Sequence, residues 1–286
     1  MKKILLLSGL VLSSSLTLQA QLADGFEQYT AGVTLNGDNG GSGPWTSAWT
    51  ASTGSGMVTA KTLVYSSGSV YSYGGNNVMS QGFSPSTDNT SYQTHRSFTA
   101  YDGATTSEFF VSFLINTPNI GAGSDDFLQI WIGSATASTS TASQTDKFGF
   151  ILRNGDIRAL SPTQEVSSSI EMANDNTYMV VMRISTDAPN GTANQYDQVD
   201  LYLNPTSTLS ESTPIATAVT SASVSSLTQL GVRFALYEAD TDGAYIDNVM
   251  IGDTWNAVVI PEKSTFMLPA LALGAAWLIG RRKKKG

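Results

Sequence analysis

The stretch Phe148-Gly-Phe-Ile-Leu-Arg-Asn-Gly-Asp-Ile-Arg158 predicts a β-hairpin, and it sets the fold class that we expect for the whole chain. An apolar run leads into Asn154-Gly155, and both of these residue types tolerate the positive φ values of a type I′ turn. Such a two-residue turn joins antiparallel strands. We therefore expect antiparallel sheet here and look for further strands on either side.

Short runs rich in β-branched and aromatic residues recur along the chain, separated by Gly, Asn, Asp, Ser and Pro. Leu230, Val232, Phe234 and Leu236 alternate with other residues, as in a strand with one buried face. The expected strands are 57–65, 109–116, 127–132, 148–153, 177–185, 198–203, 230–237 and 244–251. We predict an all-β domain over residues 24–258 that folds as a two-sheet antiparallel sandwich.

Residues 1–23 have the pattern of a secretory signal peptide. Lys2 and Lys3 provide the charged start, and an apolar segment over residues 4–18 follows. Ala20 and Ala23 are the two candidate cleavage positions. We expect an N-terminal signal helix that is removed on export.

The last residues, 259–286, form a second targeting segment with three parts. Val259, Pro261, Glu262, Ser264 and Thr265 form a short motif, and an apolar run follows over residues 266–279. As a helix this run is about 21 Å long, somewhat short for a hydrocarbon core of about 30 Å. Cations in the tail would stop transfer and stay on the cytoplasmic side. They are Arg281, Arg282, Lys283, Lys284 and Lys285.

This order of motif, apolar helix and basic cluster resembles the PEP-CTERM sorting signal. The resemblance implies that exosortase, a membrane-embedded protease, recognises the tail of an inner-membrane-anchored precursor. It also implies release to the cell surface or the extracellular matrix, in connection with exopolysaccharide. The family usually has a second Pro after the Glu, where this chain has Lys263. The alternative is a C-terminal transmembrane anchor that is never cleaved.

Charge and cysteine content narrow the function of residues 24–258. This part holds seven basic and 22 acidic residues, hence a net charge of −15, and the chain has no cysteine. Such a surface repels phosphates and anionic lipids, so we exclude nucleic acid as a partner. Divalent cations and neutral, hydroxyl-rich partners remain suitable. Stability must come from a core, with bound metal as an option, rather than from disulfides.

The two ends of this domain resemble the first and last strands of concanavalin A-like (LamG-type) jelly rolls. The matching residues are Asp24-Gly25-Phe26-Glu27 and Tyr245-Ile246-Asp247-Asn248-Val249-Met250-Ile251-Gly252. In that group the terminal strands pair, so the resemblance implies that Glu27 and Asp247 lie near each other. Two adjacent carboxylates need a shared proton or a cation. We therefore consider a structural Ca²⁺ at Glu27 and Asp247 as the candidate metal site.

Evidence for catalysis is weak. Retaining glucanases of this fold carry Glu-x-Asp-x-x-Glu on one strand, whereas Glu238-Ala-Asp240-Thr-Asp242 lacks the last Glu. This segment and Asp125-Asp126 are acidic turns or cation-binding loops. His95 is the single histidine and has no Gly-x-Ser-x-Gly partner motif. Gly74-Gly75 lacks the lysine of a phosphate loop, so we expect a turn there.

Aromatic residues in the first third of the domain are candidates for stacking on sugar rings. They are Trp45, Trp49, Tyr71, Tyr73 and Tyr92. The alternative is that these rings pack inside the sandwich. We predict an exported, non-enzymatic surface or matrix protein with a structural or adhesive role. A lectin-like carbohydrate-binding module is the second interpretation, and a divergent glycoside hydrolase is the third.

Overall fold

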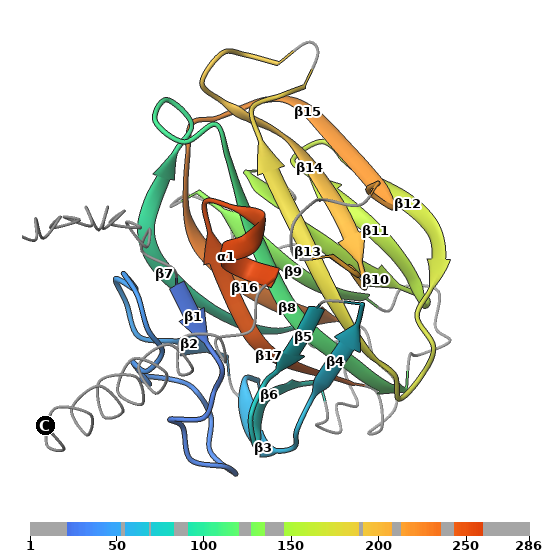
Figure 1. Ribbon diagram of the computed structural model, residues 1–286. Helices are drawn as coiled ribbons and strands as arrows, with labels where there is room; N and C mark the ends of the chain where they lie inside the picture. Colours follow the sequence, from blue (N-terminus) through green and yellow to red (C-terminus); the bar gives the residue numbers. More distant parts are fainter. Residues whose placement is uncertain are drawn as a thin grey trace, which may run out of the picture.

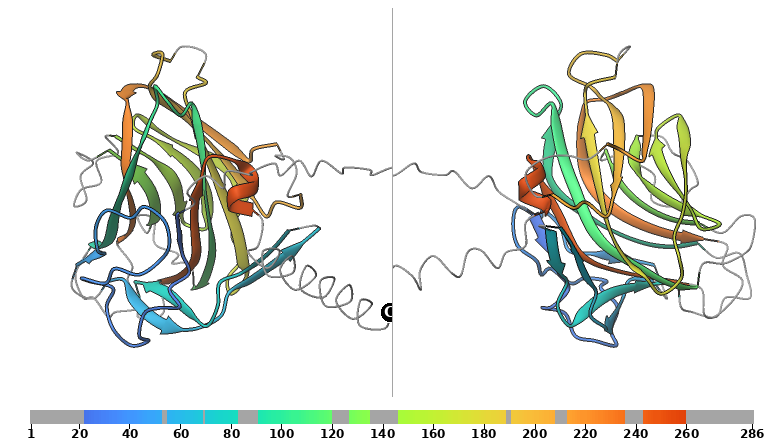
Figure 2. Two further views of the ribbon diagram at one scale, coloured as in Figure 1. Left: turned by 60° about the vertical axis from the view of Figure 1, so that its left-hand side comes forward. Right: turned by 45° about the vertical axis from the view of Figure 1, so that its right-hand side comes forward.

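The computed structural model describes residues 22–52, 55–68, 70–82, 91–119, 127–134, 146–188, 191–207, 213–235 and 243–259. Two large antiparallel sheets face each other as a jelly-roll sandwich (Figure 1). The two layers and the space between them are clearest from the side (Figure 2). We call the layer nearer the viewer in Figure 1 the front sheet and the other one the back sheet.

The front sheet has the strand order β15-β14-β13-β8-β17-β6-β3, and β1 pairs with β17 outside this path. Its strands are β1 (Leu22–Asp24), β3 (Met57–Ala60), β6 (Asn77–Gln81), β8 (Glu108–Asn119), β13 (Thr177–Ser185), β14 (Tyr196–Leu203), β15 (Ala216–Val224) and β17 (Gly243–Gly252).

The back sheet has the order β12-β11-β10-β9-β16-β7-β2. Its strands are β2 (Thr50–Ala51), β7 (Ser91–Asp102), β9 (Phe127–Gly133), β10 (Lys147–Arg153), β11 (Asp156–Ser161), β12 (Gln164–Glu171) and β16 (Ser226–Ala235). A separate hairpin joins β4 (Val64–Ser67) to β5 (Val70–Tyr73).

The main core lies between the two sheets and follows the period of two along each strand. Leu128, Ile130 and Ile132 of β9 all point into it and are fully buried. Phe113 of β8 meets Phe150 of β10 edge to face across the sandwich, with ring centroids 5.7 Å apart. Such contacts between the two inner faces hold the layers together.

A second apolar layer covers the outer face of the front sheet. The short helix α1 (Trp255–Val259) follows β17 and packs its Trp255 ring against Phe110 and Tyr202. Ser112 Oγ of β8 donates a hydrogen bond of 2.7 Å to the Val258 carbonyl. This face of the sandwich is therefore covered by α1 and by the β4–β5 hairpin, which adds Tyr65 and Val70, with Leu63 just before it.

The predicted fold class is confirmed, and so is the hairpin that suggested it. Asn154 and Gly155 have φ values of 51° and 79°, as a type I′ turn requires. The expected pairing of terminal strands is present, with Leu22 opposite Ile251 and Asp24 opposite Val249.

Other boundaries were predicted wrongly. The expected strand 57–65 is split into β3 in the front sheet and β4 in the separate hairpin. Strand β15 lies in a Ser/Thr/Ala-rich tract whose composition does not indicate strand. Helix α1 was not anticipated either, because five residues carry too short a periodic pattern.

Candidate functional site: a pocket between β1 and β6

A gap in the hydrogen-bonding edge of β17 creates the candidate site. One edge of β17 pairs with β8 along most of its length. On the other edge, β6 pairs with Ala244–Ile246, whereas β1 pairs with residues 249–251. Asp247 and Asn248 fall between the two partner strands and have no strand partner on that edge.

The backbone of β17 is irregular at the same place. The register with β8 shifts between Asp247 and Met250, and Asn248 has a φ of 47°. Asn is among the residues that adopt this left-handed conformation most readily. A bulge of this kind bends the strand locally and re-aims its side chains. It therefore turns Asp247 and Asn248 into the gap.

Two consecutive glycines approach the gap from the segment before β6. A Cβ on Gly74 would lie 1.8 Å from Asp247 Oδ2, and a Cβ on Gly75 would lie 2.0 Å from Glu27 Oε1. The chain can pass between the two carboxylates only because these positions carry no side chain. The predicted Gly-Gly turn therefore places its backbone against both Glu27 and Asp247.

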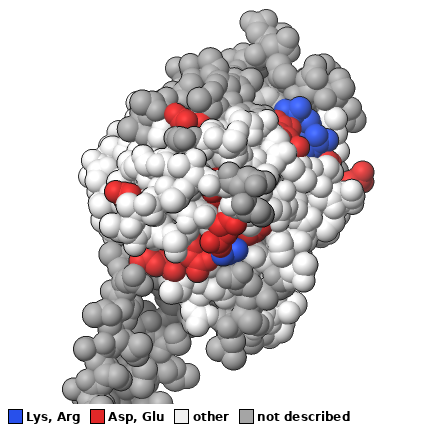
Figure 3. Space-filling model, turned by 90° about the horizontal axis from the view of Figure 1, so that it is seen from above, with Lys and Arg blue, Asp and Glu red and all other residues white. Residues whose placement is uncertain are grey.

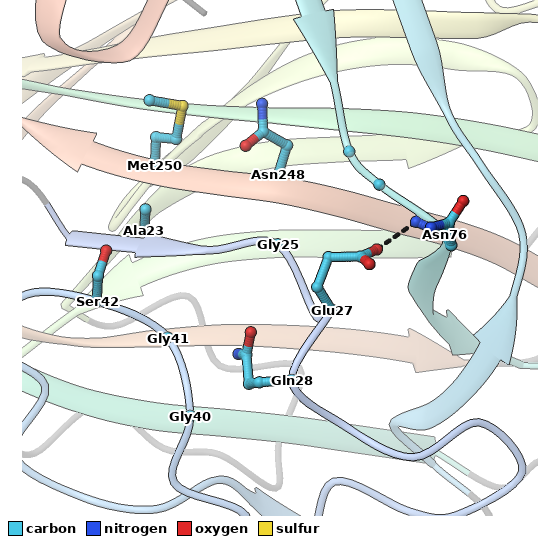
Figure 4. Close-up of a pocket in the computed structure, with 12 residues that line it drawn as sticks. Ala23, Gly25, Glu27, Gln28, Gly40, Gly41, Ser42, Asn76, Asn248 and Met250 are labelled. Carbon is cyan, nitrogen blue, oxygen red and sulfur yellow. Dashed lines mark hydrogen bonds between the residues drawn. The ribbon is translucent and has the colours of Figure 1, made fainter. Parts of the chain in front are cut away.

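The Glu27 carboxylate fixes this glycine segment in place. Its Oε1 accepts hydrogen bonds from the backbone N–H groups of Asn76 and Asn77, the latter at 2.8 Å (Figure 4). Asn77 Nδ2 in turn donates to the Tyr29 carbonyl at 3.0 Å. The residues after β1 and the start of β6 are thus tied together through a negatively charged acceptor.

Asp247 is fully buried, yet one of its oxygens has no partner. Oδ1 accepts the Asn248 backbone N–H at 2.7 Å, while Oδ2 makes no hydrogen bond. Burial raises the pKa of this carboxyl to about 9, and the nearby charges of Glu27 and Asp24 add to the effect. An ionised Asp247 would need a cation within reach, and a neutral one must hold a proton.

A pocket of about 550 Å³ opens beside these groups. Ala23, Ser42 and Met250 form one wall, and Glu27 and Asn76 form the other (Figure 4). Asn248 and Gln28 project into the space between, and several glycines expose their backbone there. We call this space the inter-strand pocket. Its lining of amides, a hydroxyl, a carboxylate and peptide groups suits a polar, hydroxyl-bearing ligand.

Glu27 and Asp247 are carboxylates, the kind of ligand that a hard cation prefers, and the Gly74-Gly75 backbone lies between them. Within the described ranges, no three His, Cys, Asp or Glu side chains gather into a group that could bind a metal by themselves. A cation here would therefore complete its coordination with backbone carbonyls, amide oxygens and water, as Ca²⁺ does.

A buried ion pair that the sequence did not predict supports the end of β1. Arg96 Nη1 of β7 lies 3.0 Å from Asp24 Oδ2, and both side chains are almost completely buried. Arg96 also donates to the Gly40 carbonyl at 2.7 Å, and its guanidinium lies 4.5 Å from the centre of the Trp45 ring. Asp24, unlike Asp247, therefore has a full set of partners. Its link to Arg96 spans 72 positions, so no local pattern could have revealed it.

Burial removes part of the predicted set of sugar-stacking rings. Trp49 is 1% exposed and donates from Nε1 to Asp24 Oδ2 at 3.0 Å, and Tyr92 is 9% exposed in the core. The prediction was wrong for these two rings, because a stacking ring must offer a face to the ligand. Trp45 and Tyr71 are partly exposed. Tyr73 lies in β5, and its side chain is outside the described residues.

The targeting segments fall largely outside the described residues. Of the predicted sorting motif only Val259 is described, and it is buried at the end of α1. Pro261, Glu262, Ser264, Thr265 and the basic tail lie outside, as do Asp125-Asp126 and Glu238–Asp242. In the part of the chain that the structure covers, no helix has the length and apolarity needed to span a membrane.

No protein-family model matches this chain, and no curated protein matches it either. Solved structures with a similar fold include an endo-1,3-β-glucanase from Streptomyces sioyaensis. It is 11% identical, with a TM-score of 0.49, over 82% of this chain and 95% of that one. Lectin II from Ulex europaeus is 12% identical, with a TM-score of 0.41, over 70% and 99%.

The metal-free carbohydrate recognition domain of Emp46p is 10% identical, with a TM-score of 0.40, over 68% of this chain and 88% of that one. At identities and TM-scores this low, none of these likenesses assigns a ligand or a reaction to this chain.

Proposed function

We propose that this chain is an exported cell-surface or extracellular-matrix protein whose jelly roll binds carbohydrate without catalysing a reaction. The observation that carries the proposal is the inter-strand pocket, with its polar lining beside the partnerless Oδ2 of Asp247. The Ser42 hydroxyl and Asn248 Oδ1 match the hydroxyl groups of a neutral sugar, while Asn248 Nδ2 donates to Ser72 Oγ at 2.6 Å. The net negative charge of residues 24–258 disfavours polyanionic partners.

A Ca²⁺ ion at Glu27 and Asp247 is part of this proposal. The ion would allow Asp247 to be ionised and would connect β17 with the segments after β1 and before β6. Its role would be to hold the wall of the pocket in one conformation, so that a sugar meets a preformed site.

Export and sorting complete the proposal. The N-terminal segment and the C-terminal motif direct the chain to exosortase at the inner membrane and then to the outside of the cell. Two observations on the folded part bear on processing. Leu22 and Ala23 belong to β1, so cleavage after Ala20 preserves this strand and cleavage after Ala23 does not. Val259 is buried, so a protease has access only beyond this residue.

The test combines mass spectrometry with ligand binding. The protein recovered from its host should begin after Ala20 and have lost its tail, and an intact C-terminus would remove the sorting proposal. Titration with neutral oligosaccharides should show binding that Asn76→Ala weakens about fivefold, because Asn76 lines the pocket. Asn256→Ala, an exposed change in α1, is the matched control. Equal binding by both variants would place the sugar elsewhere.

A further inference from the structure

The inter-strand pocket offers a ligand several side-chain oxygens, because the amide nitrogens beside them already have partners in the protein. Gln28 Nε2 donates to Asp24 Oδ1 at 2.9 Å. Asn248 Nδ2 likewise donates to Ser72 Oγ at 2.6 Å. Both side chains line the pocket (Figure 4). Since the oxygen of an amide branches away from its nitrogen, Gln28 Oε1 and Asn248 Oδ1 are left to accept hydrogen bonds from a ligand.

Glu27 adds a charged acceptor to the same space. Its Oε1 accepts the backbone N–H groups of Asn76 and Asn77, and it is also the atom closest to a Cβ placed on Gly75. The second oxygen, Oε2, accepts no hydrogen bond within the described ranges, and the side chain is exposed and lines the pocket. No ion pair among the described residues includes Glu27. One carboxylate oxygen is thus open to a donor on the ligand.

The negative charge of Glu27 is not balanced by a base in the pocket. Among the described residues that line it, none is Lys, Arg or His. Arg96 reaches the Gly40 carbonyl behind the lining, but its guanidinium is already paired with Asp24. Acidic side chains also appear at several places on the surface in Figure 3, and the basic ones visible there lie beside acidic ones. This charge distribution attracts a cationic ligand and repels an anionic one.

An ammonium group on a sugar matches these acceptors better than a hydroxyl group does. It carries a positive charge and three donors but no acceptor, as the lysine ammonium does. Hydrogen bonds in which a partner is ionised are about twice as strong as neutral ones. Ala23 and Met250 on the opposite wall offer apolar contact to the sugar ring (Figure 4). The volume of about 550 Å³ is also suited to a small ligand.

We propose that the inter-strand pocket binds an amino sugar in its protonated form, with the ammonium group paired to Glu27 Oε2. Hydroxyl groups of the same sugar donate to Gln28 Oε1 and Asn248 Oδ1. This inference rests on the proposed carbohydrate-binding function and names the class of sugar for the same site. Bound Ca²⁺ would reduce the negative charge of the Glu27 carboxylate, so the test is carried out in chelator.

Calorimetric titration of the folded protein with three trimers tests the proposal. The trimers of glucosamine, N-acetylglucosamine and glucose have the same linkage and differ only in carrying an ammonium, an amide or a hydroxyl group. At about pH 5.5 a sugar amine is protonated and an ordinary exposed carboxyl group is ionised. Salt at about 0.15 M screens the long-range attraction by the whole domain. The glucosamine trimer should bind at least fivefold more tightly than either neutral trimer.

Glu27→Gln should abolish this preference. The variant loses the negative charge but keeps an oxygen that can accept the N–H groups of Asn76 and Asn77. Glu171→Gln is the matched control, because Glu171 is exposed at the end of β12 and lies outside the pocket. It removes the same charge from the domain and should keep the preference for the glucosamine trimer.

Two results would overturn the inference. One is equal binding of the three trimers by the unmodified protein, which needs no variant to fold. The other is a preference for glucosamine that persists in Glu27→Gln. Neutral binding that Asn76→Ala weakens, without any preference for the amine, would reject the amino sugar and leave the proposed function standing. Absence of binding for all three trimers would also reject it, whereas the proposed function is then decided by the wider titration with neutral oligosaccharides.

Discussion

Each of the two sheets holds one fully buried titratable side chain with an unpartnered polar atom: Asp247 Oδ2 beside the inter-strand pocket of the front sheet, and Lys147 Nζ beside Trp131 on the outer side of the back sheet. Asp247 lies in the gap between β1 and β6 beside β17, among glycines and a second carboxylate. Lys147 lies on an intact sheet face, beside an indole and near a guanidinium. The first environment lacks a cation and the second lacks an anion. Burial thus favours the neutral form of both side chains, because it raises the pKa of Asp247 and lowers that of Lys147.

The largest loss of stability should come from removing one partner of a buried ion pair. Arg96→Leu leaves Asp24 buried without its guanidinium, so we expect the free energy of unfolding to fall by about 3–5 kcal/mol. Urea denaturation measures this change. Arg158→Leu is the control, because its pair with Asp156 is partly exposed and should contribute about 1 kcal/mol or less. Similar losses of stability in both variants would show that the buried ion pair contributes no more than the partly exposed one.

The next effect concerns the close approach of the glycine segment. Gly74→Ala forces a Cβ against Asp247 Oδ2, so we expect a loss of about 2–3 kcal/mol in the free energy of unfolding. Any calcium response should disappear with it. Gly25→Ala meets only an ordinary contact of 3.9 Å and should cost less than about 1 kcal/mol. Equal stability of the two alanine variants would contradict the close contact between Gly74 and Asp247.

A third test uses pH and calcium together. The pKa of Asp247 is raised, so in chelator its contribution to stability is complete at low pH and is lost as the pH rises through about 9. Thermal unfolding should therefore show stability declining between about pH 4 and 9, by up to about 1.4 kcal/mol per pH unit. Ca²⁺ should raise the melting temperature and oppose this decline.

Asp247→Asn should abolish both the decline and the calcium response, because the amide neither titrates nor attracts the ion strongly. If neither chelator nor added Ca²⁺ changes the melting temperature of the wild-type protein, a cation at Glu27 and Asp247 is contradicted.

The smallest effect should have the opposite sign. Lys147→Met replaces a buried, partnerless ammonium by an apolar side chain of similar shape, so we expect the ligand-free protein to gain about 1 kcal/mol at neutral pH. The pKa of Lys147 is lowered, so its neutral form stabilises the fold at high pH, and this contribution is lost as the pH falls through about 8. The stability gain of the variant should thus shrink above this pH. A destabilised Lys147→Met would indicate that Lys147 has a structural role.

Local sequence patterns predicted the architecture but only part of the site. Alternation and Asn154-Gly155 were sufficient for the hairpin and for the all-β class, because both depend on neighbours in sequence. Glu27 and Asp247 were found through the resemblance of the terminal strands. Gly74-Gly75 was interpreted only as a turn, since its role depends on carboxylates that come from distant segments.

Lys147 and Trp131 were missed for a related reason. Each looks like an ordinary strand residue, and their common face becomes visible only once β9, β10 and β16 are placed in register. The burial that makes Lys147 unusual is likewise a property of the assembled sandwich.

The docking of α1 has a consequence for how this protein meets its surroundings. Because Val258 is hydrogen-bonded to β8 and Val259 is buried, the chain leaves the folded body on the outer side of the front sheet. Anything that tethers the protein through its C-terminus must then pull on that side, and both sheets lie between the tether and the outer face of the back sheet. A tethered protein would therefore turn the outer face of the back sheet away from its attachment point.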